Sequence, residues 1–141
     1  MSEIDYAGDV SPTEAWVMLS DDPDATLVDV RTDAEFSYVG SPDLSLLKKP
    51  VHRISWKIFP DMHRNPHFEE AVQEAVPSKE TPILFLCRSG VRSVAAATTM
   101  AALGYTSCYN VTEGFEGDCS EAGHRGTVGG WKVRGLPWIQ P

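Results

Sequence analysis

Six consecutive residues, Cys87 to Arg92, bring a thiol, a glycine and two arginines together directly after an apolar run. The segment reads CRSGVR, and the preceding residues, PILFL, are typical of a buried strand. Thiolate is the nucleophilic form of cysteine, and it is stabilised by positive charge and by backbone amide groups. Arg88 and Arg92 supply the charge, and Gly90 permits a tight turn. The pattern favours covalent catalysis by Cys87 over an ordinary buried cysteine at a strand end.

The candidate site consists of Cys87 and the loop residues that follow it, namely Arg88, Ser89, Gly90, Val91, Arg92 and Ser93. An alanine-rich helix is predicted from about Ser93 to Leu103, with Gly104 just past its end. The amide groups of residues 88 to 93 and the first turn of this helix would face the sulfur and stabilise an anion there.

A cysteine phosphatase or an arsenate reductase is one rival interpretation of this loop. Cysteine phosphatases use a Cys-x5-Arg loop that surrounds a tetrahedral phosphate. Here four residues separate Cys87 from Arg92, and Ser93 stands where a phosphatase has its arginine. The loop is one residue short and contains no aspartate to act as a general acid. A smaller loop suits the transfer of a single sulfur atom better.

Strands and helices alternate along the chain that positions this loop. Strands are predicted at 25–31, 51–56, 82–86 and 107–111, and helices at about 13–20, 32–40, 65–76 and 93–103. Capping boxes at Ser11–Glu14 and Thr32–Glu35 start the first two helices. The alternation predicts an α/β fold with a parallel sheet and helices on both faces. Ligands bind beyond the carboxyl ends of such strands, and Cys87 is at one of them.

Composition limits the possible partners and the cellular compartment. The 141 residues suffice for one domain, residues 1–141, and the net charge of −8 argues against nucleic acid or an anionic membrane surface. No apolar run approaches the length of a membrane span, and the acidic start is unlike a signal peptide, so we expect a cytoplasmic protein. Three cysteines do not suggest a disulfide framework.

Four motifs together resemble the single-domain rhodaneses, or thiosulfate sulfurtransferases. They are LVDVRTDAEFSYVGSPD, LFLCRSGVRS, GYTSCYNVTEGFEG and GGWKVRGLPW. The motifs occur in the family's order, and the resemblance covers nearly the whole chain. The resemblance implies a rhodanese-like α/β sheet of about five parallel strands with helices on both faces.

The resemblance also implies a mechanism. Cys87 would attack the outer sulfur of thiosulfate or a similar small anionic donor, and sulfite would leave. A Cys87 persulfide would then pass its sulfur to a thiol or protein acceptor, without a cofactor or a metal. Arg88 and Arg92 would attract the dianion and balance charge on the sulfite. Mercaptopyruvate sulfurtransferases have small uncharged residues after the cysteine, so the arginine here favours thiosulfate. A rhodanese-like module that binds a partner without catalysis is the second rival.

Other residues are interpreted as structural or left open. Asp29, Arg31 and Glu35 occupy the family's DVR-x3-E positions, and we expect a structural ion pair and helix cap near the site. Compared with the family, the chain has a glycine-rich inserted loop at about 116–130. Cys119 on this loop is either an incidental thiol or a partner that forms a disulfide with Cys87. Cys108 is expected in the core, and the spacing of the cysteines and His124 fits no zinc site.

Overall fold

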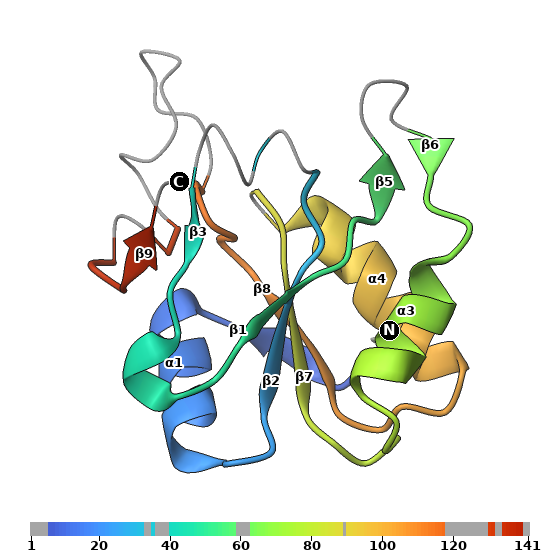
Figure 1. Ribbon diagram of the computed structural model, residues 1–141, viewed down its shortest axis with the longest axis horizontal. Coiled ribbons are helices and arrows are strands. Elements are labelled where there is room, and N and C mark those ends of the chain that lie inside the picture. The colour runs from blue at the N-terminus through green and yellow to red at the C-terminus, as the bar shows by residue number, and fades with distance from the viewer. Residues whose placement is uncertain are drawn as a thin grey trace, which may run out of the picture.

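The structure is a computed structural model that describes residues 6–32, 35, 40–58, 63–88, 90–117, 130–131 and 134–139. Within these residues a five-stranded sheet has the order β1-β8-β7-β2-β4, with all neighbours parallel (Figure 1). Its strands are β1 (Gly8–Val10), β2 (Thr26–Asp29), β4 (Val51–Arg53), β7 (Ile83–Leu86) and β8 (Cys108–Val111). The predicted α/β fold with a parallel sheet is therefore confirmed.

Helices cover both faces of the sheet, and each face has its own apolar core (Figure 1). On one face α1 (Pro12–Asp21) places Ala15 and Leu19 against Leu27, Leu84 and Leu86. The other face is covered by α3 (Phe68–Ala75) and α4 (Val91–Ala102). Successive residues of a strand point to opposite faces, so the ILFL run of β7 is buried along its whole length between the two cores.

Two helices begin at residues other than those predicted. The structure starts α3 at Phe68, because Asn65 uses its side chain to accept the amide of His67 at 3.0 Å in a turn before the helix. It starts α4 at Val91, two residues earlier than expected, with Gly90 as the N-cap at φ 107°. Ser11, in contrast, caps α1 through the predicted capping box with Glu14.

Short elements that were not predicted flank the carboxyl end of the sheet. Two antiparallel ladders pair β3 (Ser41–Pro42) with β9 (Trp138–Ile139) and β5 (Lys57–Ile58) with β6 (His63–Arg64). Figure 1 shows both ladders toward the end at which the central strands finish. A 3-10 turn, η1 (Ser45–Leu47), follows β3. None of the helices in the described ranges is long and apolar enough to cross a membrane.

Candidate functional site

Cys87 follows β7 directly and lies at the start of α4. Its Sγ accepts the backbone N–H of Gly90 at 3.1 Å and lies 3.3 Å from Oγ of Ser93 in the first turn of the helix. Only 1% of the residue is exposed. The sulfur therefore sits where the helix dipole and a backbone amide both stabilise negative charge.

The segment after β8 holds the cysteine loop from the side. The carbonyl oxygen of Cys87 accepts the N–H of Phe115 at 2.8 Å, and that of Arg88 accepts the N–H groups of Glu116 and Gly117 at 2.9 and 3.1 Å. The approach is too close for a side chain at Gly90, where a Cβ would collide with the carbonyl oxygen of Thr112. Backbone contacts with a second strand end thus fix the position of the loop.

Arg92 turns toward Glu35 and forms a two-pronged ion pair with it. Nη1 and Nη2 donate to the two carboxylate oxygens at 2.7 and 2.9 Å. Burial raises the pKa of Glu35, but the hydrogen bonds and charge of Arg92 outweigh it and the pKa is lowered. The pKa of Arg92 is raised although burial opposes it, mainly by Glu35 and partly by the nearby Cys87. Arg92 is thus held by Glu35 and interacts with Cys87 through charge alone.

Asp29 and Arg31 form a separate, fully buried ion pair. Nη2 of Arg31 donates to Asp29 at 2.7 Å and to the carbonyl oxygen of Gly40 at 2.8 Å, and its guanidinium lies 4.3 Å from the Phe115 ring centre. Thr32 and Glu35 make the reciprocal hydrogen bonds of a capping box. The expected ion pair and cap are both present, but Glu35 has the additional role of holding Arg92.

The structure describes some of the remaining predicted site residues and not others. Arg88 is exposed, whereas Ser93 is fully buried beside the sulfur. Ser89 and the side chain of Val91 lie outside the described residues, as does Cys119 with residues 118–129 of the inserted loop. Cys108 is buried in the core, and burial raises its pKa to about 12.

Two polar residues that sequence reasoning missed adjoin the site. Ser93 Oγ donates to Oδ1 of Asn110 at 2.5 Å, and Nδ2 of Asn110 donates to Asp9 at 3.1 Å. Asn110 belongs to β8 and Asp9 to β1. The signal available in the sequence was a single amide side chain inside the otherwise strand-like run SCYNV, because a buried amide needs hydrogen-bond partners.

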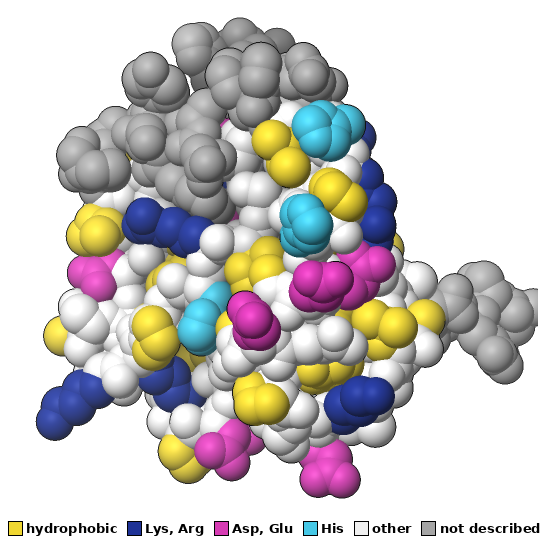
Figure 2. All heavy atoms as spheres, turned by 45° about the vertical axis from the view of Figure 1, so that its right-hand side comes forward, with side chains coloured by type: hydrophobic (Ala, Val, Ile, Leu, Met, Phe, Trp, Pro, Cys, Tyr) yellow, Lys and Arg dark blue, Asp and Glu magenta, His cyan; other side chains and the backbone are white. Residues whose placement is uncertain are grey.

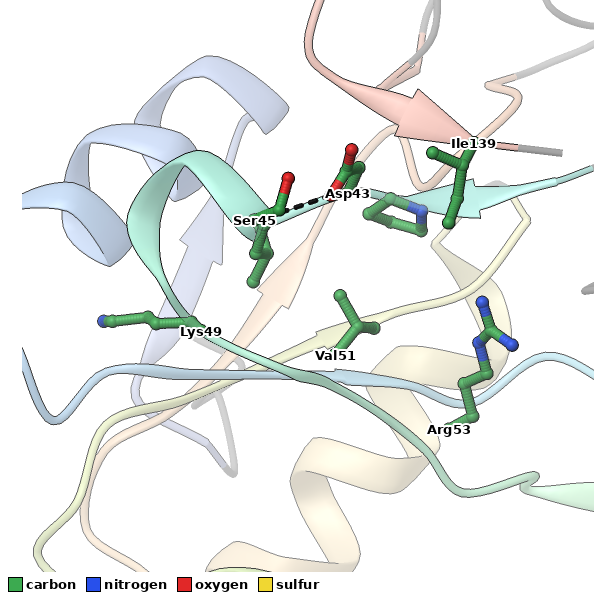
Figure 3. A pocket seen from close by; sticks show the side chains of 8 residues that line it. Asp43, Ser45, Lys49, Val51, Arg53 and Ile139 are labelled. Atoms are coloured by element: carbon green, nitrogen blue, oxygen red, sulfur yellow. Dashed lines mark hydrogen bonds between the residues drawn. The ribbon is translucent and has the colours of Figure 1, made fainter.

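A cavity of about 320 Å³ lies elsewhere, beside edge strand β4 (Figure 3). Lys49 at its rim points away and donates to the carbonyl oxygens of Asp22 and Ala25, while Arg53 donates to Oγ of Ser41. Cys87 does not line this cavity. The cavity lining therefore contains no thiol, and the candidate site remains the cysteine loop.

Two features of the described residues bear on metal binding and on nucleic-acid binding. Among the described residues no cluster of three or more histidine, cysteine or acidic side chains is arranged to hold a metal ion. On the face shown in Figure 2, acidic, basic and histidine side chains of the described residues are interspersed. The described residues on that face therefore form no continuous positive area of the kind typical of nucleic-acid binding.

Comparison with known proteins identifies close relatives over nearly the full chain. The family model described as the STR4 middle domain matches residues 7–141. The crystal structure of Rv0390 from M. tuberculosis has 47% sequence identity and a TM-score of 0.90, over 96% of this chain and 99% of that chain. The uncharacterized protein RP600 of Rickettsia prowazekii is 39% identical over 130 residues, which are 92% of this chain and 94% of that protein.

More distant similarities indicate the wider group. A sulfurtransferase of Allochromatium vinosum is 28% identical over 123 residues, 87% of this chain and 86% of that protein. The rhodanese-like domain of an Anabaena protein shares the fold, with a TM-score of 0.58 at 14% identity over 99% of this chain and 81% of that chain. The predicted resemblance is confirmed at the level of rhodanese-like fold and relatives. The chain thus belongs to the STR4 middle domain family and has the rhodanese-like fold.

Proposed function

We propose that this protein is a sulfurtransferase that carries sulfane sulfur as a persulfide on Cys87. The observation that supports this most directly is the position of Sγ, which lies at the carboxyl end of β7 and in front of α4, 3.1 Å from the amide nitrogen of Gly90. A persulfide is an anion at neutral pH, and a helix N-terminus with a donating amide stabilises an anion.

The reaction is a double displacement. The Cys87 thiolate attacks the outer sulfur of thiosulfate, a new S–S bond forms, and the original S–S bond breaks with its electron pair leaving on sulfite. The total charge is the same before and after this step. A thiolate or cyanide then attacks the outer sulfur of the persulfide and regenerates the Cys87 thiolate.

The two arginines have different roles in this proposal. Arg88 is exposed and attracts a small anionic donor to the loop. Arg92 keeps its ion pair with Glu35 and adds positive charge beside the sulfur, in line with the contribution of Cys87 to its raised pKa. The donor is a small sulfane anion such as thiosulfate, and the acceptor is a thiol or a protein.

The local geometry supports sulfur transfer over phosphoryl transfer. Ser93, which occupies the position of the phosphatase arginine, places a hydroxyl 3.3 Å from Sγ instead of a guanidinium. Arg92, one residue earlier, directs both of its terminal nitrogens at Glu35. Arg92 therefore does not present its guanidinium to the cysteine for binding phosphate through two parallel hydrogen bonds.

The experiment that tests the proposal is intact-protein mass spectrometry after incubation with thiosulfate. We expect a gain of one sulfur atom that cyanide removes as thiocyanate. Cys87→Ser should show no gain, and Cys119→Ser, as the matched cysteine control, should behave like the wild type. Sulfur on Cys119 would identify a different thiol.

The two rival functions predict other outcomes. No gain of sulfur from thiosulfate or from polysulfide would contradict the proposal and favour a partner-binding module. Cys87-dependent hydrolysis of an aryl phosphate would favour a phosphatase. Both assays use the same purified chain and the same Cys87→Ser variant, so the three functions are distinguished directly.

A further inference from the structure

A chain of hydrogen bonds leads from the sulfur of Cys87 across the sheet to Asp9. Sγ lies 3.3 Å from Oγ of Ser93, Ser93 lies 2.5 Å from Oδ1 of Asn110, and Nδ2 of Asn110 lies 3.1 Å from Oδ1 of Asp9. The three partners come from α4, β8 and β1. Cys87, Ser93 and Asn110 are each 3% exposed or less.

The far end of this chain determines the direction of every hydrogen bond in it. A carboxylate oxygen only accepts, and the same Asp9 oxygen also accepts the hydroxyl of Tyr6 at 2.7 Å. Asn110 must therefore present its N–H to Asp9 and its carbonyl oxygen to Ser93. An amide oxygen also only accepts, so Ser93 gives its single hydrogen to Asn110.

This direction leaves Ser93 with only lone pairs facing Cys87. The neutral thiol fits, because its S–H donates to Ser93 Oγ. A thiolate only accepts hydrogen bonds. The N–H of Gly90 donates one at 3.1 Å, and Ser93 supplies a second only if its hydroxyl turns away from Asn110. Two acceptors then compete for one hydrogen in a buried place where water does not replace the lost bond.

We propose that Asn110, oriented by Asp9, is a positioning residue that controls whether the Ser93 hydroxyl donates to the sulfur of Cys87. With the hydroxyl on Asn110 the uncharged thiol is favoured, and with the hydroxyl on sulfur the anion is favoured. Asn110 thus restrains the reactivity of the resting cysteine. The inference deepens the proposed function because the same sulfur would carry the persulfide.

The other charged groups near the sulfur are unchanged in the variants that test the role of Asn110. Arg92 of α4 is held by Glu35 and interacts electrostatically with Cys87, and Arg88 is exposed on the loop. Asp29 and Arg31 pair with each other at the end of β2. Variants of Asn110, Ser93 and Asp9 leave all of these unchanged, so differences between the variants report on the hydrogen-bonded chain.

The test measures alkylation of Cys87 by iodoacetamide, read by peptide mass, as a function of pH. Asn110→Leu removes the acceptor at similar volume and leaves Ser93 with the sulfur as its partner. We expect Asn110→Leu to react about threefold to tenfold faster at neutral pH, the range of one ordinary hydrogen bond, with its rate profile moved to lower pH. In the Ser93→Ala background the Asn110→Leu change should have no effect, because Asn110 acts only through the Ser93 hydroxyl.

Two outcomes would overturn the inference. In the first, Asn110→Leu reacts no faster than the wild type; in the second, its acceleration persists without the Ser93 hydroxyl. Persistence would mean that the substitution merely opens the site. If Asn110→Leu does not fold, Asp9→Ala provides the same test from an exposed position. Asp9→Ala should also accelerate alkylation, by a smaller factor than Asn110→Leu, and only when the Ser93 hydroxyl is present. A simple effect of the lost charge would persist in the Ser93→Ala background.

Alkylation requires no sulfur donor, which keeps this test separate from the proposed function. If the variants change alkylation as expected but the wild type takes up no sulfur, only the sulfurtransferase proposal is overturned. Normal sulfur loading together with an unresponsive Asn110 variant would overturn only the inference about Asn110.

Discussion

Arg92 forms an ion pair with the carboxylate of Glu35, and the electrostatic interaction with Cys87 makes a smaller contribution to its raised pKa. The sequence indicated Cys87 and the arginines, because a thiol, two cations and a glycine are adjacent in it. It did not indicate that Glu35 binds Arg92, since 57 residues separate them and only the folded sheet brings them together. For the same reason Asn110 and Asp9, on other strands, were missed.

Glu35→Gln tests the ion pair through the pH dependence of stability. The pKa of Glu35 is lowered in the folded protein, below the unfolded value of about 4.3, so its contribution to stability is full above that value and is lost as the pH falls through the folded pKa. Urea unfolding should show wild type more stable than Glu35→Gln by about 1–3 kcal/mol at pH 7. The difference should shrink toward pH 3. A Gln at exposed Glu70 serves as the control, and an equal pH-dependent difference there would contradict the assignment.

Arg92→Gln tests the same ion pair through the rate of persulfide formation on Cys87. Without the guanidinium, the Glu35 carboxylate stays near Cys87 as an uncompensated negative charge. We expect persulfide formation from thiosulfate to slow by about tenfold or more. The double variant Glu35→Gln/Arg92→Gln should recover part of this rate because it removes the repelling charge as well. A double variant slower than Arg92→Gln alone would show that Glu35 helps the reaction in another way.

The element that presents the cysteine is the β7–loop–α4 unit. Its strand was predicted from four consecutive apolar residues, but its helix begins two residues earlier than the alanine-rich pattern suggested. The physical reason is Gly90, which takes φ 107° and ends the turn early so that Val91 can start the helix. As a result, Arg92 and Ser93 belong to the first helical turn and have fixed directions.

Gly90→Ala should disable this unit, because a Cβ there would collide with the Thr112 carbonyl oxygen in a backbone conformation that alanine rarely adopts. We expect a loss of about 2–4 kcal/mol in unfolding free energy and little sulfur loading at Cys87. Gly135→Ala is the matched control, since its φ is also positive, at 75°, but nothing lies within 4 Å of the added Cβ. That variant should lose only about 1 kcal/mol and load normally. Similar losses in both variants would mean that the collision at Gly90 is relieved by local movement.

At the scale of the whole molecule, the alternation of strands and helices was enough to predict the parallel sheet with helices on both faces. The edge strand β1 was not predictable, because Gly8–Val10 contains no apolar run and its pairing with β8 is decided by tertiary contacts. The two-residue ladders likewise lack a sequence pattern. The β3–β9 ladder depends on the close approach of two backbone segments, since a Cβ at Gly40 would meet the Ile139 carbonyl oxygen at 2.6 Å.

Trp131 connects the C-terminal segment to the core and to the support of the cysteine loop. It is fully buried, meets Trp16 edge-on with ring centres 6.0 Å apart, and donates its indole N–H to the carbonyl oxygen of Pro137 at 2.7 Å. Its backbone N–H donates at 2.8 Å to Gly114, within the segment that holds the loop. Of the two tryptophans in the described part of this C-terminal tail, Trp131 is fully buried, whereas Trp138 is 39% exposed.

Trp131→Ala should therefore lower both stability and activity, and Trp138→Ala much less. Removing a fully buried tryptophan costs about 3–5 kcal/mol, which corresponds to a fall of about 10–17 °C in Tm for a domain of this size. Because the Gly114 segment also holds the loop, sulfur loading of Trp131→Ala should be slower even at temperatures at which the variant is folded. Thermal unfolding by circular dichroism and intact-mass loading at about 15–20 °C, well below the Tm of about 45–65 °C that is usual for mesophilic domains, separate the two effects. Equal melting temperatures for the two variants would contradict this assignment, and normal loading by a folded Trp131→Ala protein would show that Gly114 supports the loop without help from the tail.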